Sequence, residues 1–139
     1  MILIITNVME GGLIVSRMIS IVTDQVQMKA DLNNSSTADL IWENLPIEGK
    51  VSTWGEEIYF EIPVKAEHDN AVSIVEEGDL AYWPEGRSFC IFFGQTPAST
   101  AGEIRPASPV NLVGRLLGDP KEWNDAEQGS YIILRKAES

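Results

Sequence analysis

The chain has 139 residues, which is the length of one domain built around a single hydrophobic core. Its 10 Lys and Arg residues against 21 Asp and Glu residues give a net charge of −11 at pH 7. This charge argues against a nucleic acid or an anionic membrane as partner, because both are bound mainly through Lys and Arg. The single cysteine, Cys90, lies in an apolar run and cannot form an intramolecular disulfide, so we expect a cytoplasmic protein in a reducing compartment.

Residues 1–17 are predicted to be an N-terminal extension of a domain that spans residues 18–139. No basic residue precedes the apolar run of residues 1–5, and residues 10–12 interrupt it, so we expect neither a signal peptide nor a membrane span. Two explanations for the extension stay open: an added strand or hairpin, or a start codon assigned upstream of Met18. A hairpin would place its apolar residues against a sheet edge or against a neighbouring subunit. Contact with a neighbouring subunit would make the protein a homo-oligomer.

A strand or hairpin is predicted from residue 18 to residue 31, where β-branched and apolar residues recur. The main helix is predicted over Ser36–Leu45, because Ser36 and Asp39 form a weak capping box and Pro46 ends the helical region. One apolar stripe of this helix should cover an opening of the fold. The stripe consists of Ala38, Ile41, Trp42 and Leu45.

Most of the remaining chain is predicted to form short strands separated by turns. They span residues 50–54, 56–62, 80–83, 88–93, 110–117 and 130–134. A second, short helix should begin at Asp119, since Pro120 suits the first helical position, and end by Gly129. Many short strands with two helices indicate a closed barrel or a sandwich. The strand 88–93 is apolar on both faces, so we expect it to be covered on both sides, by a filled barrel interior and by a helix outside.

The residues that usually carry catalysis or bind metals do not form a recognisable group in this sequence. A zinc site needs several Cys or His ligands, and His68 and Cys90 are the single members of each type. Glu57 and Glu61 share a strand face but are about 13 Å apart, beyond the roughly 5 to 9.5 Å of paired catalytic carboxyls. His68 lies in a polar stretch and is interpreted as a solvated loop residue. We therefore predict neither a metal nor a cofactor.

Aromatic residues with a possible cationic partner are the strongest candidates for a binding site. Trp and Tyr suit the rim of a pocket because each carries a polar group, whereas the Phe residues are mostly expected in the core. Arg105 lies between Ile104 and Pro106 in an irregular segment. Its guanidinium could bind a ligand carbonyl or carboxylate, or it could form a buried ion pair with Glu57 or Glu103. The predicted ligand-binding residues are Trp54, Tyr59, Tyr82, Phe92 and Arg105.

Three segments, 54–60 (WGEEIYF), 79–84 (DLAYWP) and 103–111 (EIRPASPVN), resemble the small prokaryotic cyclophilin-like proteins, an uncharacterised family. The resemblance runs from about Met18 to Leu134. It implies a mainly β fold, a cyclophilin-like closed β-barrel of about eight strands with one main helix and one short helix. It also implies a groove on the barrel that could hold a small molecule or a short peptide.

Two other functions stay open beside ligand binding. Cyclophilins themselves are prolyl isomerases, and their catalytic arginine lies in a Phe-His-Arg segment. The most similar strand here, residues 57–62, contains neither His nor Arg, which weakens the isomerase hypothesis. The third hypothesis is a non-catalytic structural or interaction domain.

Overall fold

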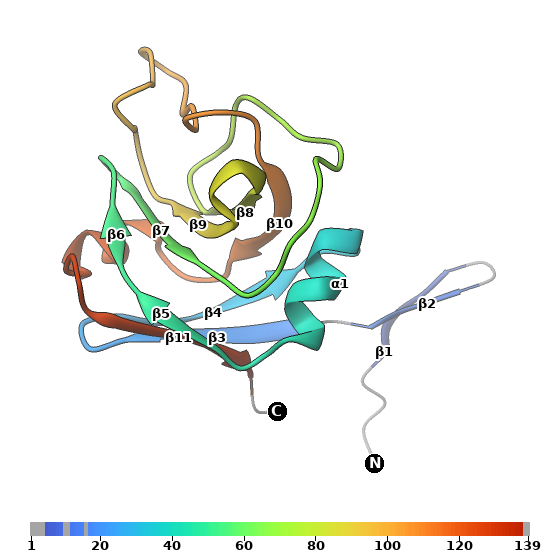
Figure 1. The fold of residues 1–139 in the computed structure, drawn as a ribbon. Coiled ribbons are helices and arrows are strands. Elements are labelled where there is room, and N and C mark those ends of the chain that lie inside the picture. Colours follow the sequence, from blue (N-terminus) through green and yellow to red (C-terminus); the bar gives the residue numbers. More distant parts are fainter. Residues whose placement is uncertain (1–4, 10–11, 16, 138–139) are drawn as a thin grey trace.

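The computed structural model describes residues 5–9, 12–15 and 17–137, and a single antiparallel sheet dominates it (Figure 1). The nine strands of this sheet are β3 (Arg17–Thr23), β4 (Gln27–Leu32), β5 (Ile47–Lys50), β6 (Ser52–Thr53), β7 (Glu57–Glu61), β8 (Asp79–Trp83), β9 (Ser88–Phe92), β10 (Asn111–Leu116) and β11 (Tyr131–Lys136). They pair in the order β5-β11-β3-β4-β10-β8-β9-β7-β6. The predicted hairpin at residues 18–31 corresponds to β3 and β4, which pair directly.

The two ends of this strand order meet, so the sheet is nearly closed into a barrel. β5 and β6 are separated by Val51 alone, and they pair with β11 and β7 respectively. The backbone N–H of Val51 also donates to the carbonyl of Ser130 at 2.9 Å. Residues 47–53 thus act as one bent strand, and the prediction of a closed barrel of about eight strands is confirmed.

The main helix, α1 (Ser36–Glu43), packs against the barrel beside β10 (Figure 1). Its N-cap is Ser35, one residue before the predicted start, and the Ser35 Oγ accepts from the Ala38 N–H at 3.1 Å. Of the predicted apolar stripe, two side chains are fully buried and two are partly buried against the core. The buried pair is Ala38 and Ile41, and the partly buried pair is Trp42 and Leu45.

The second predicted helix is shorter than expected. It is a 3-10 helix over Pro120–Asp125, and the Asp119 side chain caps it by accepting from the Lys121 N–H at 3.0 Å. Trp123 in this helix is fully buried in the main core, although its sequence neighbours are polar. A further 3-10 turn at Pro84–Gly86 follows β8 at a position predicted only as a turn.

Strand β9 is buried on both faces, as the sequence predicts, but its outer cover differs from the expectation. Inside the barrel, Phe89 and Ile91 join the main core. Outside, loops take the place of the expected helix, because isolated bridges join Val72 to Val110 and Val75 to Ile104. A small second core, here called the outer cluster, lies under these loops. It consists of Val75, Ala81, Cys90, Phe92 and Val110.

The N-terminal extension contains two short strands of its own. β1 (Ile5–Met9) and β2 (Gly12–Val15) pair in a separate two-stranded antiparallel sheet. The other residues of the predicted extension, 1–4, 10–11 and 16, lie outside the described residues. That the barrel folds without residues 1–17 stays a prediction, which circular dichroism of a chain starting at Met18 would test. No helix within the described part of the chain is long and apolar enough to cross a membrane.

Candidate functional site

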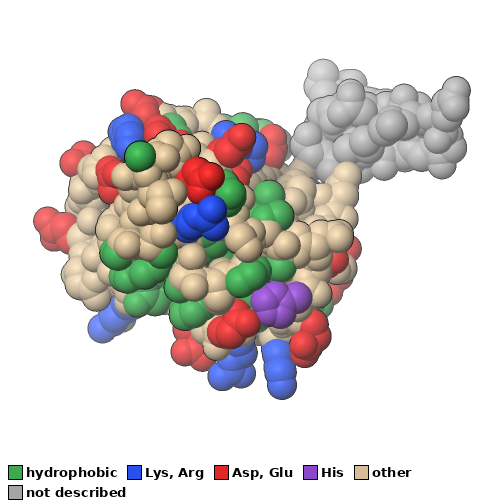
Figure 2. Space-filling view, turned by 90° about the horizontal axis from the view of Figure 1, so that it is seen from above, with side chains coloured by type: hydrophobic (Ala, Val, Ile, Leu, Met, Phe, Trp, Pro, Cys, Tyr) green, Lys and Arg blue, Asp and Glu red, His purple; other side chains and the backbone are tan. Residues whose placement is uncertain are grey.

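A pocket of about 230 Å³ lies beside the outer cluster, under the loop that joins β9 to β10. Its walls come from the β6–β7 turn, from β7, from the end of β8 and from that loop. The lining residues are Trp54, Glu57, Tyr59, Trp83, Pro106, Ala107 and Val110. Figure 2 shows the loop end of the barrel, where hydrophobic side chains gather in patches between acidic and basic ones.

The β6–β7 turn places Glu57 and Tyr59 on the outer face of the barrel. Alternate residues of a strand point to the same side, so Ile58 and Phe60 fill the interior while Glu57 and Tyr59 face outward. The turn itself needs Gly55, whose φ is +63°. A side chain at Gly55 would also collide with the adjoining loop, because its Cβ would lie 2.8 Å from Pro97 Cδ.

Trp83 is held in place by a chain of polar contacts. Its Nε1 donates to Ser108 Oγ at 2.6 Å, and the Ser108 hydroxyl donates to Glu85 Oε1 at 3.2 Å. His68 Nε2 lies 3.0 Å from the other Glu85 oxygen. The rings of Tyr59 and Trp83 meet edge to face, with centroids 6.4 Å apart and planes at 86°. The two rings therefore form a rigid corner of the pocket.

Among the residues that the structure describes, Glu57 is the only acidic one that lines this pocket, and it is 6% exposed. Burial raises the pKa of its carboxyl from 4.5 to about 7, while a hydrogen bond with the Cys90 side chain acts in the opposite direction. The Cys90 thiol has two acceptors within reach, the Ser88 carbonyl at 3.8 Å and the Glu57 carboxyl. The carboxylate is the stronger acceptor because it is charged. The ion pairs found among the described residues do not include Glu57.

The five residues predicted to bind a ligand are divided among three places. Trp54 and Tyr59 line the pocket. Tyr82 points to the opposite face of β8, where its hydroxyl donates to the Val64 carbonyl at 2.7 Å. Phe92 is fully buried in the outer cluster. Arg105 forms an ion pair with Glu103 at 2.7 Å and lines a neighbouring hollow.

The pair formed by Arg105 and Glu103 is the arrangement predicted as the alternative to ligand binding, but it is not buried. Both side chains are 38% exposed. The hollow beside them shares Pro106 and Ala107 with the pocket. The role of Arg105 in binding therefore stays a prediction.

Five of the seven lining residues are not among the predicted ones, and the two of these with polar side-chain atoms are Trp83 and Glu57. Trp83 is one of the Trp and Tyr residues that suit a pocket rim, and it precedes Pro84 at the end of a predicted strand. From the sequence, Glu57 is considered as a partner of Glu61 or of Arg105, and not as a residue that lines the pocket. The available signal was its alternation with Tyr59, which places both on one strand face.

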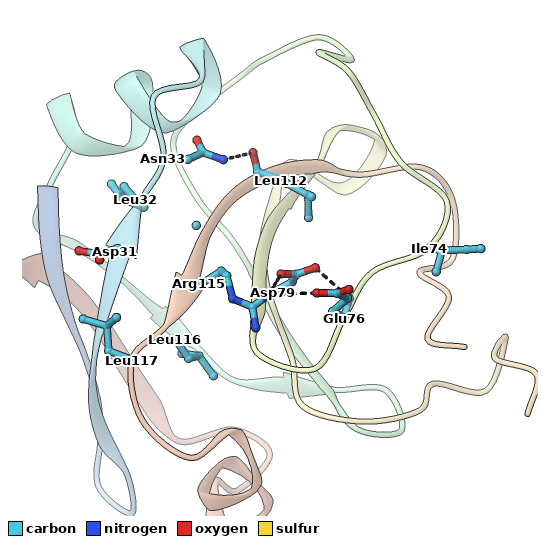
Figure 3. A pocket seen from close by; sticks show the side chains of 11 residues that line it. Asp31, Leu32, Asn33, Ile74, Glu76, Asp79, Leu112, Arg115, Leu116 and Leu117 are labelled. Carbon is cyan, nitrogen blue, oxygen red and sulfur yellow. Dashed lines mark hydrogen bonds and ion pairs between the residues drawn. The ribbon is translucent and has the colours of Figure 1, made fainter. Parts of the chain in front are cut away.

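A wider groove of about 720 Å³ runs along the outer side of β10 and β4 (Figure 3). Its central charges already satisfy one another, because Arg115 Nη1 lies 2.5 Å from Asp79 and 3.5 Å from Glu76. Figure 3 also shows Asn33 at the upper end, where its side-chain amide donates to the Leu112 carbonyl at 2.9 Å. Asp31 also lines this groove, and its buried Oδ1 atom has no hydrogen-bond partner, but the residue as a whole is partly exposed. The pocket at Glu57 is the better candidate, since its carboxyl is buried beside aromatic walls and belongs to none of the ion pairs of the described residues.

A family model and two solved structures are similar to this chain. A family model described as Cyclophilin-like matches residues 17–135. The solution structure of the hypothetical protein AF2241 from Archaeoglobus fulgidus is 32% identical, with a TM-score of 0.76, and the match covers 88% of this chain and 95% of that one. The structure of McbB in complex with tryptophan is 16% identical, with a TM-score of 0.68. That match covers 87% of this chain and 45% of McbB, so it shows a shared fold. No match is found among curated proteins.

Proposed function

Because the chain belongs to the cyclophilin-like family and carries an aromatic pocket on the outside of its barrel, we propose that it binds a small molecule there. The observation that carries this proposal is one buried carboxyl, Glu57, in a pocket otherwise walled by aromatic and aliphatic side chains. Such sites gain affinity from their apolar walls and orientation from a few fixed polar groups. The volume of about 230 Å³ suits a single-ring molecule or one side chain of a short peptide.

Hydrogen bonds within the loop over the pocket support a preformed binding site. The loop over the pocket is fastened by hydrogen bonds from the Arg105 N–H to Ser99 Oγ at 3.0 Å and from Thr96 Oγ1 to the Arg105 carbonyl. A preformed site avoids the entropic cost of ordering on binding. McbB, which shares this fold over 45% of its length, has a structure in complex with tryptophan, and this is compatible with a small molecule as ligand.

The isomerase alternative has less support. Rotation about the prolyl bond meets a barrier of about 18 to 20 kcal/mol, and lowering it requires a fixed donor at the prolyl nitrogen. Among the described residues, no Lys or Arg lines the pocket, and the guanidinium of Arg105 is paired with Glu103. Exchange NMR on an Ala-Pro peptide tests the alternative, and we expect no catalysis.

The binding proposal can be tested with four one-ring or two-ring fragments: indole, benzyl alcohol, benzylamine and benzoate. The protein has four tryptophans, of which Trp54 and Trp83 line the pocket while Trp42 and Trp123 pack against the main core. We expect at least one fragment to shift the indole N–H signals of Trp54 and Trp83 in NMR spectra and to leave the other two signals in place. Affinities near 1 mM are expected of ligands of this size, about −4 kcal/mol.

Two variants control this experiment. Trp54→Ala should weaken the binding of that fragment, because it removes one wall. Tyr131→Ala should not, since Tyr131 is 65% exposed and is not among the residues that line the pocket. Absence of any shift at Trp54 and Trp83 with all four fragments would contradict the proposal.

A further inference from the structure

The pocket contains a buried carboxyl group that pairs with no cationic side chain of the described residues. We propose that its ligand is a compact organic ammonium ion, which pairs with the Glu57 carboxylate while its carbon atoms contact Trp54 and Trp83. This inference rests on the proposed binding function and specifies the charge of the ligand.

Two buried carboxyl groups occur within the described residues, and they differ in what they contact. Asp79 and Glu57 are each 6% exposed. Asp79 lies 2.5 Å from Arg115 Nη1. A buried carboxylate is stable only when it is paired or hydrogen-bonded, and Glu57 has just the weak thiol donor of Cys90. Because Glu57 lines the pocket, a bound cation would supply the missing partner.

The charged residues next to Glu57 in the turn, on its strand and in the overlying loop are already paired with other side chains. Glu56, the preceding residue, lies 3.5 Å from Lys121 Nζ. On the same strand Glu61 lies 3.5 Å from Arg87, and in the overlying loop Arg105 lies 2.7 Å from Glu103. From β9, the neutral thiol of Cys90 faces Glu57, and burial raises its pKa well above the usual value. No described Lys or Arg side chain therefore competes with a ligand for the Glu57 carboxylate.

The walls of the pocket also suit a cation. The faces of Trp and Tyr rings carry partial negative charge and attract ammonium groups, Trp most strongly. Tyr59 and Trp83 stand at 86° to each other, so an ammonium in the corner contacts two different ring surfaces. The net charge of −11 raises the local concentration of cations around the whole protein.

The pH dependence of binding follows from the same group. With a pKa of about 7, the Glu57 carboxyl is largely protonated at pH 6 and largely ionised at pH 8. An ammonium ion binds the ionised form, so its affinity should rise by about tenfold between these two pH values. A neutral ligand of the same shape should show no such rise.

The experiment compares matched pairs of probes by calorimetry or by the NMR signals of Trp54 and Trp83. Benzylammonium is compared with benzyl alcohol, and choline with 3,3-dimethylbutanol, at pH 8. We expect each cation to bind about tenfold or more tightly than its neutral counterpart. Glu57→Gln, which removes the charge and keeps the shape, should abolish this preference. Glu56→Gln, a change of the neighbouring surface carboxylate, should leave it intact.

The results separate this inference from the binding function on which it rests. If the neutral probes bind as well as the cations, and the affinity does not depend on pH between 6 and 8, the inference is wrong while the binding function stands. If neither kind of probe, nor any of the four fragments, moves the pocket signals, both are wrong. The probe comparison and its pH profile use the unaltered protein, so they decide the question even where Glu57→Gln fails to fold.

Discussion

Glu57 and Asp79 occupy similar positions and have different surroundings. Each is the first residue of a strand, each is 6% exposed, and burial raises the pKa of each carboxyl. Asp79 is balanced by Arg115 and by the backbone N–H of Glu76, which donates to it at 2.8 Å. Glu57 instead faces an aromatic pocket. A buried carboxylate whose partners are all supplied by the protein stabilises the fold. A buried carboxyl that lines a pocket and lacks a cationic partner indicates a candidate binding site.

The sharpest test of this comparison is the pH dependence of stability. The carboxyl of Glu57 has a pKa of about 7 in the folded chain and an ordinary value of 4.5. The folded state therefore holds the proton more tightly, so the stability that Glu57 contributes is fully present below pH 4.5 and lost as the pH rises to 7. At about 1.4 kcal/mol per pKa unit, this loss amounts to about 3 kcal/mol.

Replacing Glu57 isolates that contribution. Glu57→Gln should be more stable relative to the wild type at pH 8 than at pH 4.5, by about 3 kcal/mol in urea unfolding. Glu56→Gln should show no comparable change, since Glu56 lies on the surface beside Lys121. A difference between Glu57→Gln and wild type that is constant across this range would mean that the Glu57 carboxyl is not perturbed.

Removing the cationic partner of Asp79 should lower the stability of the folded protein at pH 7. Arg115→Met keeps most of the side-chain length and leaves the Asp79 carboxylate buried without a cation. We expect a loss of about 1 to 3 kcal/mol at pH 7, the cost of an unsatisfied buried group. The loss should shrink in the double variant Arg115→Met, Asp79→Asn. Unchanged stability in the single variant would show that Asp79 needs no partner, and the contrast with Glu57 would disappear.

The contact between Cys90 and Glu57 produces a smaller effect. The Cys90 side chain lowers the pKa of the Glu57 carboxyl, so Cys90→Ala should raise that pKa further. The signal of the side-chain carboxyl carbon (Cδ) of Glu57, followed by NMR between pH 5 and 9, measures this pKa. Ser88→Ala, a change on the same strand face that leaves the thiol in place, is the matched control. A Glu57 pKa that does not move would assign the thiol proton to the Ser88 carbonyl.

The barrel fold could be predicted from the sequence, but the residues that form its pocket could not. The strands can be predicted because the alternation of apolar residues and the turn residues are local properties of the sequence. The resemblance of residues 54–60 to a known family supports the same prediction. The burial of Glu57 is not local. Pro106 and Ala107, about fifty residues later in the chain, line the pocket together with Glu57. The sequence around Glu57 is acidic, so it predicts an exposed turn.

Some errors could have been avoided by stricter use of strand alternation. Tyr82 and Trp83 are adjacent in one strand, so they point to opposite faces and only one of them can line the pocket; the prediction names Tyr82, and the pocket contains Trp83. The burial of Trp123 could not be predicted in this way. It follows from a short 3-10 helix that packs against the core, and its neighbouring residues in sequence are polar or charged.

Arg105 supplies the smallest expected effect and a second contrast with Arg115. Its ion pair with Glu103 is short, 2.7 Å, but both side chains are 38% exposed, and solvent screens such pairs. Arg105→Ala should therefore change the unfolding free energy by at most about 1 kcal/mol, less than Arg115→Met.

Arg105→Ala should also leave the affinity for benzylammonium nearly unchanged, because Arg105 lines the neighbouring hollow rather than the pocket. A clear loss of stability would instead show that the pair holds the loop over Glu57. In that case the indole signal of Trp83 should move as well, since Ser108 of the same loop is its hydrogen-bond partner.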